Sequence, residues 1–162
     1  IPPKKGRQHI LRIIRELIEF EPRSRSTNIS EGLRYLTNVI KKHATSFVIS
    51  DFLDFEENTN EPAFKNALKI ANNKHDIVAL KVYDKREAEL PPVGFMRAKD
   101  AETGKMVWID SQSKKVRKKF ADWWNYTDDL TKQLFKKYGI DFAKITTDED
   151  YVKPLIRLFE NR

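Results

Sequence analysis

A hydroxyl and a carboxylate are the first residues in this chain whose types and spacing suit metal chemistry. Thr27 lies in a polar segment before a helical pattern, and Asp51 directly follows the apolar run Phe47-Val48-Ile49. Mg²⁺ and Mn²⁺ prefer oxygen ligands, usually one or two carboxylates with hydroxyls and waters. Ligands of open α/β sheets bind outside the carboxyl ends of strands, so we expect both side chains at one sheet edge. The structural alternative is that Ser26 or Thr27 helps to cap a helix and that Asp51 caps a turn.

A denser set of acidic residues lies in the loop that begins at Asp51. Asp51, Asp54, Glu56 and Glu57 could together hold two metal ions for phosphoryl transfer. The enzyme that this pattern would suit is a metal-dependent nuclease or phosphatase that uses Asp51, Asp54 and Glu56. The sequence places no Lys or His base beside these acids, so a solvated acidic loop is the simpler interpretation and no catalytic residue is predicted.

A basic segment near the carboxyl-terminal third offers a third kind of chemistry. Lys114-Lys115-Val116-Arg117-Lys118-Lys119 is followed one turn later by Trp123 and Trp124. Such a helix could follow a phosphate backbone and stack bases on its aromatic rings. Tryptophans at helical spacing more often belong to a core and lysines to a solvated face, so we do not favour nucleic acid as the partner.

The composition excludes several classes of site. The chain has 162 residues and a formal net charge of +7, with no Cys and with three scattered histidines, His9, His43 and His75. Disulfides and thiolate metal sites are therefore impossible, and the histidine spacing does not suit zinc. No apolar run approaches the roughly 18 residues of a membrane span. We expect a single soluble, cytoplasmic domain with no membrane segment.

Periodicity predicts which elements position these residues. The helical stripe Ile10, Ile13, Ile14 and Leu17 predicts an amphipathic helix from Gly6 to Phe20, and the run Phe47-Val48-Ile49 predicts a strand buried on both faces of a parallel sheet. Asn28-Ile29-Ser30-Glu31 has the form of a capping box before a second helix. A third helix is expected with Asn60 as its N-cap, Pro62 in its first turn, and Phe64, Ala67, Leu68 and Ala71 inward. The remaining predicted elements are a strand over 76–83, an inserted hairpin over about 94–110 with Asp100 and Gly104 in its turn, a helix over 114–138 in which 127–129 could be a break, and a strand over 140–146. A last helix begins at 147–150, with Tyr151, Leu155, Leu158 and Phe159 inward.

Three ordered segments carry a resemblance to a known family. Residues 25–33, 47–52 and 146–155 resemble the carboxyl-terminal part of a von Willebrand factor A-like domain, most closely the bacterial "domain of unknown function 58" family. The resemblance implies a three-layer α/β/α Rossmann-like sheet with a metal-ion-dependent adhesion site, in which Thr27 and Asp51 match two ligands. It also implies a non-catalytic module whose ion accepts an acidic side chain of a partner protein. MoxR-type AAA ATPases are the partners that the resemblance suggests.

The chain departs from that family pattern in its principal metal loop. No DxSxS occurs; Ser24-Arg25-Ser26 lacks a preceding Asp, and Asp110-Ser111-Gln112-Ser113 has the wrong spacing. Asp51 is followed by Phe52, where many relatives of the wider superfamily have Gly. We therefore expect residues 1–162 to be one partial domain that begins after the first strand and binds Mg²⁺ or Mn²⁺ weakly. The strand at 45–51 would then have a bare edge, and we expect the chain to form a homodimer or higher assembly through these residues.

Overall fold

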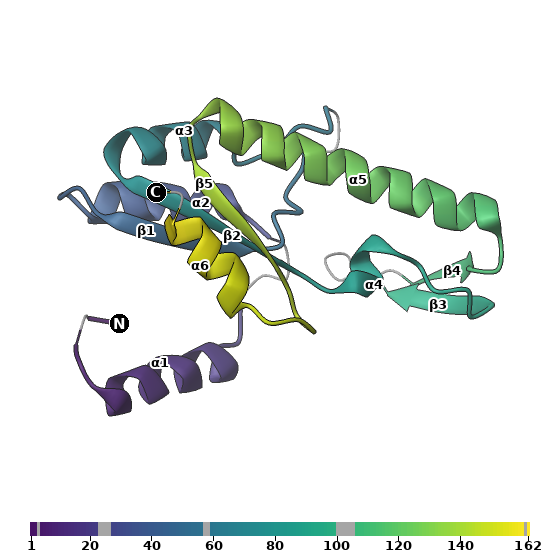
Figure 1. Cartoon of the computed structure of the whole chain (residues 1–162), viewed down its shortest axis with the longest axis horizontal. Helices are drawn as coiled ribbons and strands as arrows, with labels where there is room; N and C mark the ends of the chain where they lie inside the picture. The colour runs from purple at the N-terminus through teal and green to yellow at the C-terminus, as the bar shows by residue number, and fades with distance from the viewer. Residues whose placement is uncertain (3, 23–26, 57–58, 100–105, 161) are drawn as a thin grey trace.

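A parallel sheet of three strands lies at the centre of the molecule. The computed structural model of the chain describes all residues except 3, 23–26, 57–58, 100–105 and 161. The strands pair in the order β1-β2-β5, with Thr45 opposite Asp76 and Val78 opposite Asp141 (Figure 1). The strands are β1 (Thr45–Ser50), β2 (Asp76–Tyr83) and β5 (Asp141–Thr146). The predicted α/β class and the parallel pairing of three strands are confirmed.

Helices cover the sheet on both sides. On one side, Ile77 and Ala79 of β2 belong to a core cluster with residues of three helices; on the other, Val78 and Leu80 pack with Leu158. Alternate residues of a strand point to opposite faces, so β2 is buried from both directions. The three helices on the first side are α2 (Ile29–Val39), α3 (Lys65–Lys74) and α5 (Lys114–Lys137), and the helix on the second is α6 (Val152–Glu160).

The third helix has the predicted inner face but begins later than predicted. The four side chains Phe64, Ala67, Leu68 and Ala71 are buried, as their spacing indicated. The predicted N-cap at Asn60 and first turn at Pro62 are wrong, because α3 begins at Lys65. Asn60 has φ 52°, in the left-handed region, and its N–H donates to the carbonyl of Glu56, so it belongs to a turn of the preceding loop.

Helix α5 runs without interruption, so the proposed break at 127–129 is wrong. Thr127 is buried, and its hydroxyl donates to the carbonyl of Trp124 at 2.9 Å, which satisfies the hydroxyl inside its own helix. The buried stripe of the helix contains polar as well as apolar residues. Its members are Trp124, Thr127, Asp128, Thr131, Leu134 and Phe135.

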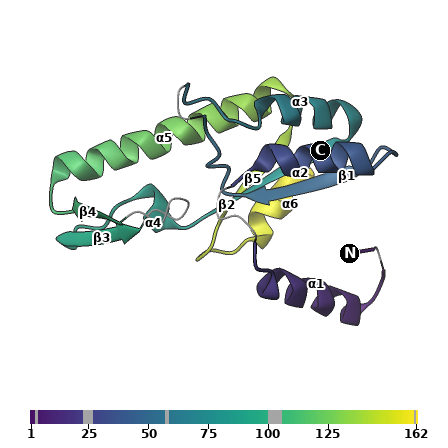
Figure 2. The same ribbon diagram turned by 180° about the vertical axis from the view of Figure 1, so that it is seen from behind.

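The predicted hairpin insertion is confirmed. Strands β3 (Phe95–Lys99) and β4 (Met106–Asp110) pair antiparallel, with Phe95 opposite Asp110. A short helix, α4 (Lys85–Ala88), precedes them, and Figure 2 shows the hairpin beside the amino-terminal part of α5, away from the sheet. The predicted turn residues Asp100 and Gly104 lie outside the described residues.

Two predicted core elements are much more exposed than their sequences suggested. Strand β1 alternates between exposed and half-buried residues, so it is not buried on both faces; Phe47 is 47% and Ile49 67% exposed. The reason is that β1 is an edge strand. Helix α1 (Arg7–Glu19) is one residue shorter at each end than predicted and buries no residue, and it stands apart from the sheet in Figures 1 and 2. In α6, Leu158 is buried and Leu155 half-buried as predicted, whereas Phe159 and Tyr151, which precedes the helix, are mostly exposed.

Candidate functional site

A depression lies at the carboxyl ends of β1 and β2. It has a volume of about 460 Å³, and both Thr27 and Asp51 line it. The structure thus brings the two predicted ligands to one place, although they come from different segments of the chain. Other residues with oxygen-bearing side chains line the same depression, namely Ser50, Tyr83, Asp84, Glu87 and Thr147. Oxygen donors of this kind suit a hard divalent cation.

The turn after β1 holds the Asp51 carboxylate in place. Its Oδ1 accepts hydrogen bonds from the Leu53 N–H at 3.1 Å and from the Ser50 hydroxyl at 3.3 Å. The Ser50 Oγ in turn accepts the Phe52 N–H at 3.1 Å. The turn-capping role proposed as the alternative for Asp51 is therefore present. It engages Oδ1, so it is compatible with a ligand role for Oδ2.

The residue after Asp51 has a backbone conformation that glycine favours. Phe52 has φ 56°, which costs about 1 kcal/mol or more in a residue with a Cβ. Its side chain is fully buried, with its ring 5.1 Å from the Phe135 ring and 5.7 Å from the Phe64 ring. Burial of the phenyl ring offsets the backbone strain. A phenylalanine can therefore occupy a position at which glycine would be unstrained.

The acidic residues further along the loop serve local structure. Asp54 Oδ2 accepts the N–H of Ile29 at 2.9 Å, which ties the loop to the positively polarised start of α2. Glu56 accepts the hydroxyl of Thr59 at 3.0 Å, and Glu57 lies outside the described residues. In the part of the chain that the structure describes, no group of three or more His, Cys, Asp or Glu could hold a metal ion. The proposed set of Asp51, Asp54 and Glu56 does not form such a group.

Sequence reasoning missed two acids of the depression, Asp84 and Glu87. Asp84 follows β2 as Asp51 follows β1, and its side chain caps α4 by accepting the Arg86 N–H at 2.8 Å. Partial burial raises the pKa of Glu87, and the negative charges of Asp51 and Asp84 add to this rise. The signal that could have revealed Asp84 is the one used for Asp51, an acid directly after an apolar strand.

A buried ionic network lies between β2, β5 and α5, and sequence reasoning missed it. Lys81, which is 2% exposed, has its Nζ 3.2 Å from Oδ1 of Asp128 and 4.9 Å from the Trp124 ring centre. Lys132 and Lys144 approach Oδ2 of Asp128 at 2.8 and 2.7 Å. Burial opposes ionisation of Asp128, but hydrogen bonds from these two lysines and the charge of Lys81 lower its pKa to about 2. Burial lowers the pKa of Lys81.

The basic start of α5 does not present the predicted pair of stacking rings. Trp124 is buried, whereas Trp123 is 48% exposed. Arg117 is engaged locally, because its Nη1 donates to the carbonyls of Ser111 and Gln112 at 2.6 and 2.8 Å. The preference against nucleic acid stays a prediction.

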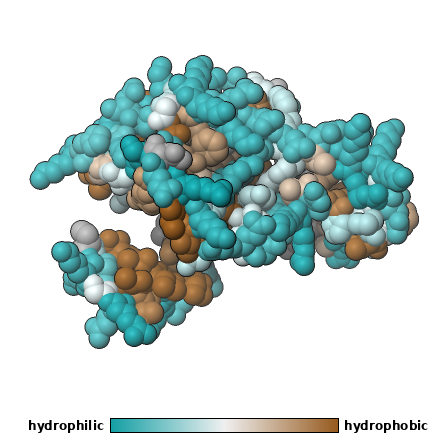
Figure 3. Space-filling view, in the orientation of Figure 1, coloured by the Kyte–Doolittle hydropathy of each residue, from teal (hydrophilic) through white to brown (hydrophobic). Residues whose placement is uncertain are grey.

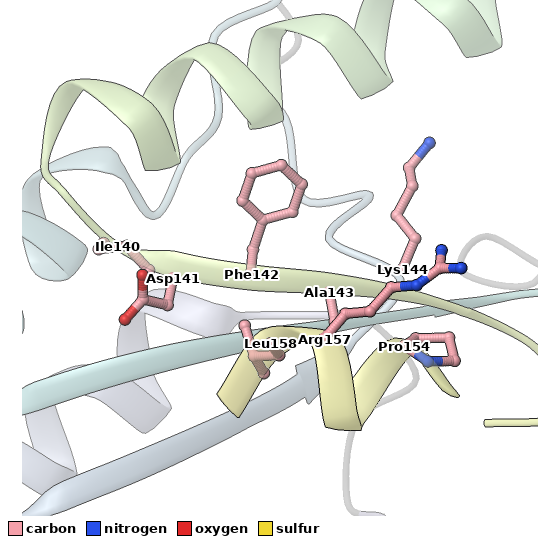
Figure 4. Close-up of a pocket in the computed structure, with 8 residues that line it drawn as sticks. All are labelled: Ile140, Asp141, Phe142, Ala143, Lys144, Pro154, Arg157 and Leu158. Carbon is pink, nitrogen blue, oxygen red and sulfur yellow. The ribbon is translucent and has the colours of Figure 1, made fainter. Parts of the chain in front are cut away.

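A second depression, between β5 and α6, has side chains that are already engaged. The hollow has a volume of about 450 Å³, and Figure 4 shows Arg157 and Leu158 on α6, whereas Lys144 of β5 points to the opposite side of the strand. Lys144 pairs with Asp128, and Asp141 Oδ2 accepts the Arg162 Nε–H at 2.8 Å. The depression that contains Asp51 is therefore the stronger candidate site.

Comparison with known proteins places the chain in a sequence family. The family described as "Protein of unknown function DUF58" matches residues 1–127. The chain is similar to the uncharacterized protein Rv1480 of Mycobacterium tuberculosis, with 25% identity over 164 residues, which cover 100% of this chain and 50% of that protein. It is also 25% identical to the uncharacterized protein MAV169 of Mycobacterium avium over 167 residues, which cover 100% of this chain and 93% of that protein.

The chain spans about half the length of the Mycobacterium tuberculosis relative. No solved structure matches it. Among the described residues, no helix is both long enough and apolar enough to cross a membrane.

Proposed function

We propose that this chain, which belongs to the DUF58 family of proteins of unknown function, is a non-catalytic protein-interaction module. The binding surface in this proposal is the carboxyl edge of the sheet, where a divalent metal ion would join Asp51 to an acidic side chain of a partner protein. The observation that supports it is the convergence of Thr27 and Asp51 on one depression.

The proposal includes a von Willebrand factor A-like, Rossmann-like arrangement of the sheet. Two features support it: the strands are parallel in the order β1-β2-β5, and helices cover both sides of the sheet. In this arrangement the free edge of β1 is the position at which the strand carrying a DxSxS loop would pair. That strand would bring the ligands that this chain lacks.

The donor chemistry fits Mg²⁺ or Mn²⁺, but the donor number is small. Thr27 would supply a hydroxyl and Asp51 its Oδ2, while the Leu53 N–H and the Ser50 hydroxyl hold Oδ1 and orient the carboxylate. Two protein ligands leave most of an octahedral shell to water, so this chain by itself should bind the ion weakly. When bound, the ion would supply the positive charge that attracts the acidic side chain. A MoxR-type AAA ATPase is the partner that we propose.

The test is the substitution Asp51→Ala in the full-length protein that contains this chain, with Asp129→Ala as the matched control. Asp129 is 65% exposed and lies on α5, outside the depression. Loss of a ligand should weaken Mn²⁺ binding in calorimetry at least as much as loss of an outer-shell partner, which costs roughly 10- to 100-fold. Binding to a purified MoxR-type AAA ATPase should weaken in parallel, and Asp129→Ala should change neither.

Unchanged affinities in Asp51→Ala would refute the proposal. Manganese-dependent cleavage of a generic phosphodiester that is lost in Asp54→Asn would instead support the nuclease or phosphatase alternative. No observation in the structure favours that alternative, because Asp54 is engaged in capping α2.

A further inference from the structure

One face of the β3–β4 hairpin is exposed and apolar, whereas a strand surface that faces solvent is usually polar. Alternate residues of a strand point to the same side, and so do directly paired residues, so the pairing of Arg97 with Trp108 assigns each side chain to a face. On one face, Met96, Ala98 and Ile109 are half-buried. Contiguous exposed apolar side chains mark interaction surfaces. The opposite face, which we call the outer face, exposes Phe95 by 77%, Trp108 by 69% and Met106 by 45%, together with the side chain of Arg97.

Hydrogen bonds at the base of the hairpin hold it against α5. The hydroxyl of Ser111, which is fully buried, donates to the carbonyl of Gly94 at 2.6 Å and accepts the N–H of Val93 at 3.0 Å. Arg117 of α5 donates to the carbonyl of Ser111 at 2.6 Å. The outer face is therefore held in one position before any partner arrives, which lowers the entropy that binding costs.

The outer face is separate from the free edge of β1. The hairpin follows α4 at the carboxyl end of β2, and Figures 1 and 2 place it beside the start of α5. The edge that the proposed function assigns to a further strand belongs to β1. A strand added there would extend the sheet away from β2 and α5, and it would not cover the hairpin.

The residue types of the outer face favour a protein as its partner. Phe, Trp, Met and Arg are enriched at the centres of protein–protein interfaces, whereas Lys is depleted there. Asp110, which pairs with Phe95, adds a carboxylate to the same face. A nucleic acid or an anionic membrane would bring phosphates against this carboxylate, whereas a protein segment can place an uncharged residue there. The exposed lysines lie instead at the start of α5, beside the hairpin, and are Lys114, Lys115, Lys118 and Lys119.

The charge of this part of the chain favours an acidic partner. Residues 93–119 carry eight Lys or Arg and three Asp or Glu. Arg97 lies opposite Trp108, so its guanidinium group can donate two hydrogen bonds to a carboxylate beside an exposed ring. Figure 3 shows hydrophobic and hydrophilic surface adjoining at the hairpin end of the molecule.

We propose that the outer face binds an acidic segment of another protein. An apolar side chain of the segment packs against the rings of Phe95 and Trp108, which are diagonal neighbours on the outer face, and a flanking carboxylate pairs with Arg97. The lysines at the start of α5 attract the remaining acidic residues of the segment, and added salt should weaken this attraction. The site at Asp51 takes no part in this contact, so the inference extends beyond the proposed function.

Fluorescence anisotropy of a labelled synthetic peptide, titrated with the full-length protein that contains this chain, tests the proposal. The peptide has leucines flanked by glutamates, and a second peptide has lysine in place of each glutamate. Trp108→Ala and Phe95→Ala should each raise the Kd of the acidic peptide by about tenfold or more. Arg97→Glu should weaken the acidic peptide and strengthen the lysine peptide, because it reverses a charge on the outer face. The matched control is Ile70→Ala on α3, where the native side chain is 58% exposed and the Kd should not change.

Amide hydrogen exchange of the wild-type full-length protein locates the acidic peptide without a variant. Amides of β3 and β4 should gain protection when the peptide is added, because a two-stranded hairpin is only marginally stable by itself. Absence of binding at millimolar peptide would overturn the proposal, as would equal binding of the lysine peptide or an unchanged Kd in both alanine variants.

Two further probes distinguish the other classes of partner. Tighter binding of a single-stranded oligonucleotide or of anionic phospholipid vesicles, lost in Trp108→Ala, would overturn the proposal in favour of that class. Asp51→Ala and EDTA should leave binding of the acidic peptide unchanged. The proposed function and this inference can therefore fail separately.

Discussion

The buried ionic network of Asp128 provides the sharpest quantitative prediction. The Asp128 side chain is only 7% exposed, and three lysines surround it. Burial opposes ionisation of the carboxyl group, but the three lysines outweigh it and lower the pKa from its usual value of 3.8 to about 2. Each pKa unit corresponds to 1.36 kcal/mol, so ionisation of Asp128 should stabilise the folded chain by about 2 kcal/mol.

The pH range of this contribution follows from the direction of the shift. Because the folded-state pKa lies below the unfolded value, the stabilisation is complete above about pH 4 and is lost as the pH falls toward 2. We expect the free energy of unfolding of the wild-type chain, measured by urea denaturation, to fall by about 2 kcal/mol more than that of Asp128→Asn over this range. Asp129→Asn, which alters an exposed neighbour, should follow the wild type.

The same network predicts the cost of the substitution at neutral pH. Asp128→Asn leaves the ammonium group of Lys81 buried without its counter-charge, which costs roughly 3–5 kcal/mol of folding stability. The double substitution Lys81→Met with Asp128→Leu removes both charges and should recover most of this loss. Parallel stability curves for wild type and Asp128→Asn between about pH 5 and pH 2 would refute the reasoning, as would no recovery in the double variant.

Two further predictions concern the turn after β1 and a buried histidine. Phe52→Gly should be more stable than Phe52→Ala by about 1 kcal/mol in urea denaturation, because both lose the ring but only glycine relieves the positive φ; the reverse order would contradict the strain. His75 is 1% exposed, and neither ring nitrogen has a hydrogen-bond partner among the described residues. Burial, with the charges of Lys74 and His43, lowers its pKa. Its folded-state pKa lies below the unfolded value near 6.5, so stability should be full above about pH 6.5 and should decline as the pH falls below it, and His75→Phe should have a smaller decline. Equal pH slopes for His75→Phe and wild type would exclude that role.

Strands and helices with a plain apolar period were predictable from the sequence. The strand expected over 76–83 has those bounds, and the inner face expected for α3 is the buried one. Parallel pairing followed from alternation of strands with helices, which requires crossover connections. The convergence of Thr27 and Asp51 was predictable too, since parallel strands share one carboxyl edge.

Polar residues in the interior were not predictable in the same way. Thr127 and Asp128 lie in a segment whose sequence favours a break, yet both are buried on a continuous helix. The hydroxyl of Thr127 donates to a carbonyl of the helix, and the carboxylate of Asp128 pairs with lysines. Lys81 lies within an otherwise apolar strand, and the composition of that strand predicts aliphatic side chains around it rather than a carboxylate. Burial of this ammonium group depends on Asp128, which is 47 residues away in the chain. Local periodicity gives no information about contacts between residues so far apart in sequence.

The α/β class, the hairpin insertion and the position of Asp51 after an apolar strand followed from the sequence alone. Local propensity and apolar period are sufficient for these features, because they depend on neighbours in the chain. Three features required the folded structure: the exposure of one face of β1, the hydrogen bond of Asp54 to the start of α2, and the position of Glu87 beside Asp51 in one depression. Each of these depends on which surfaces meet in space, and burial is a property of the assembled layers.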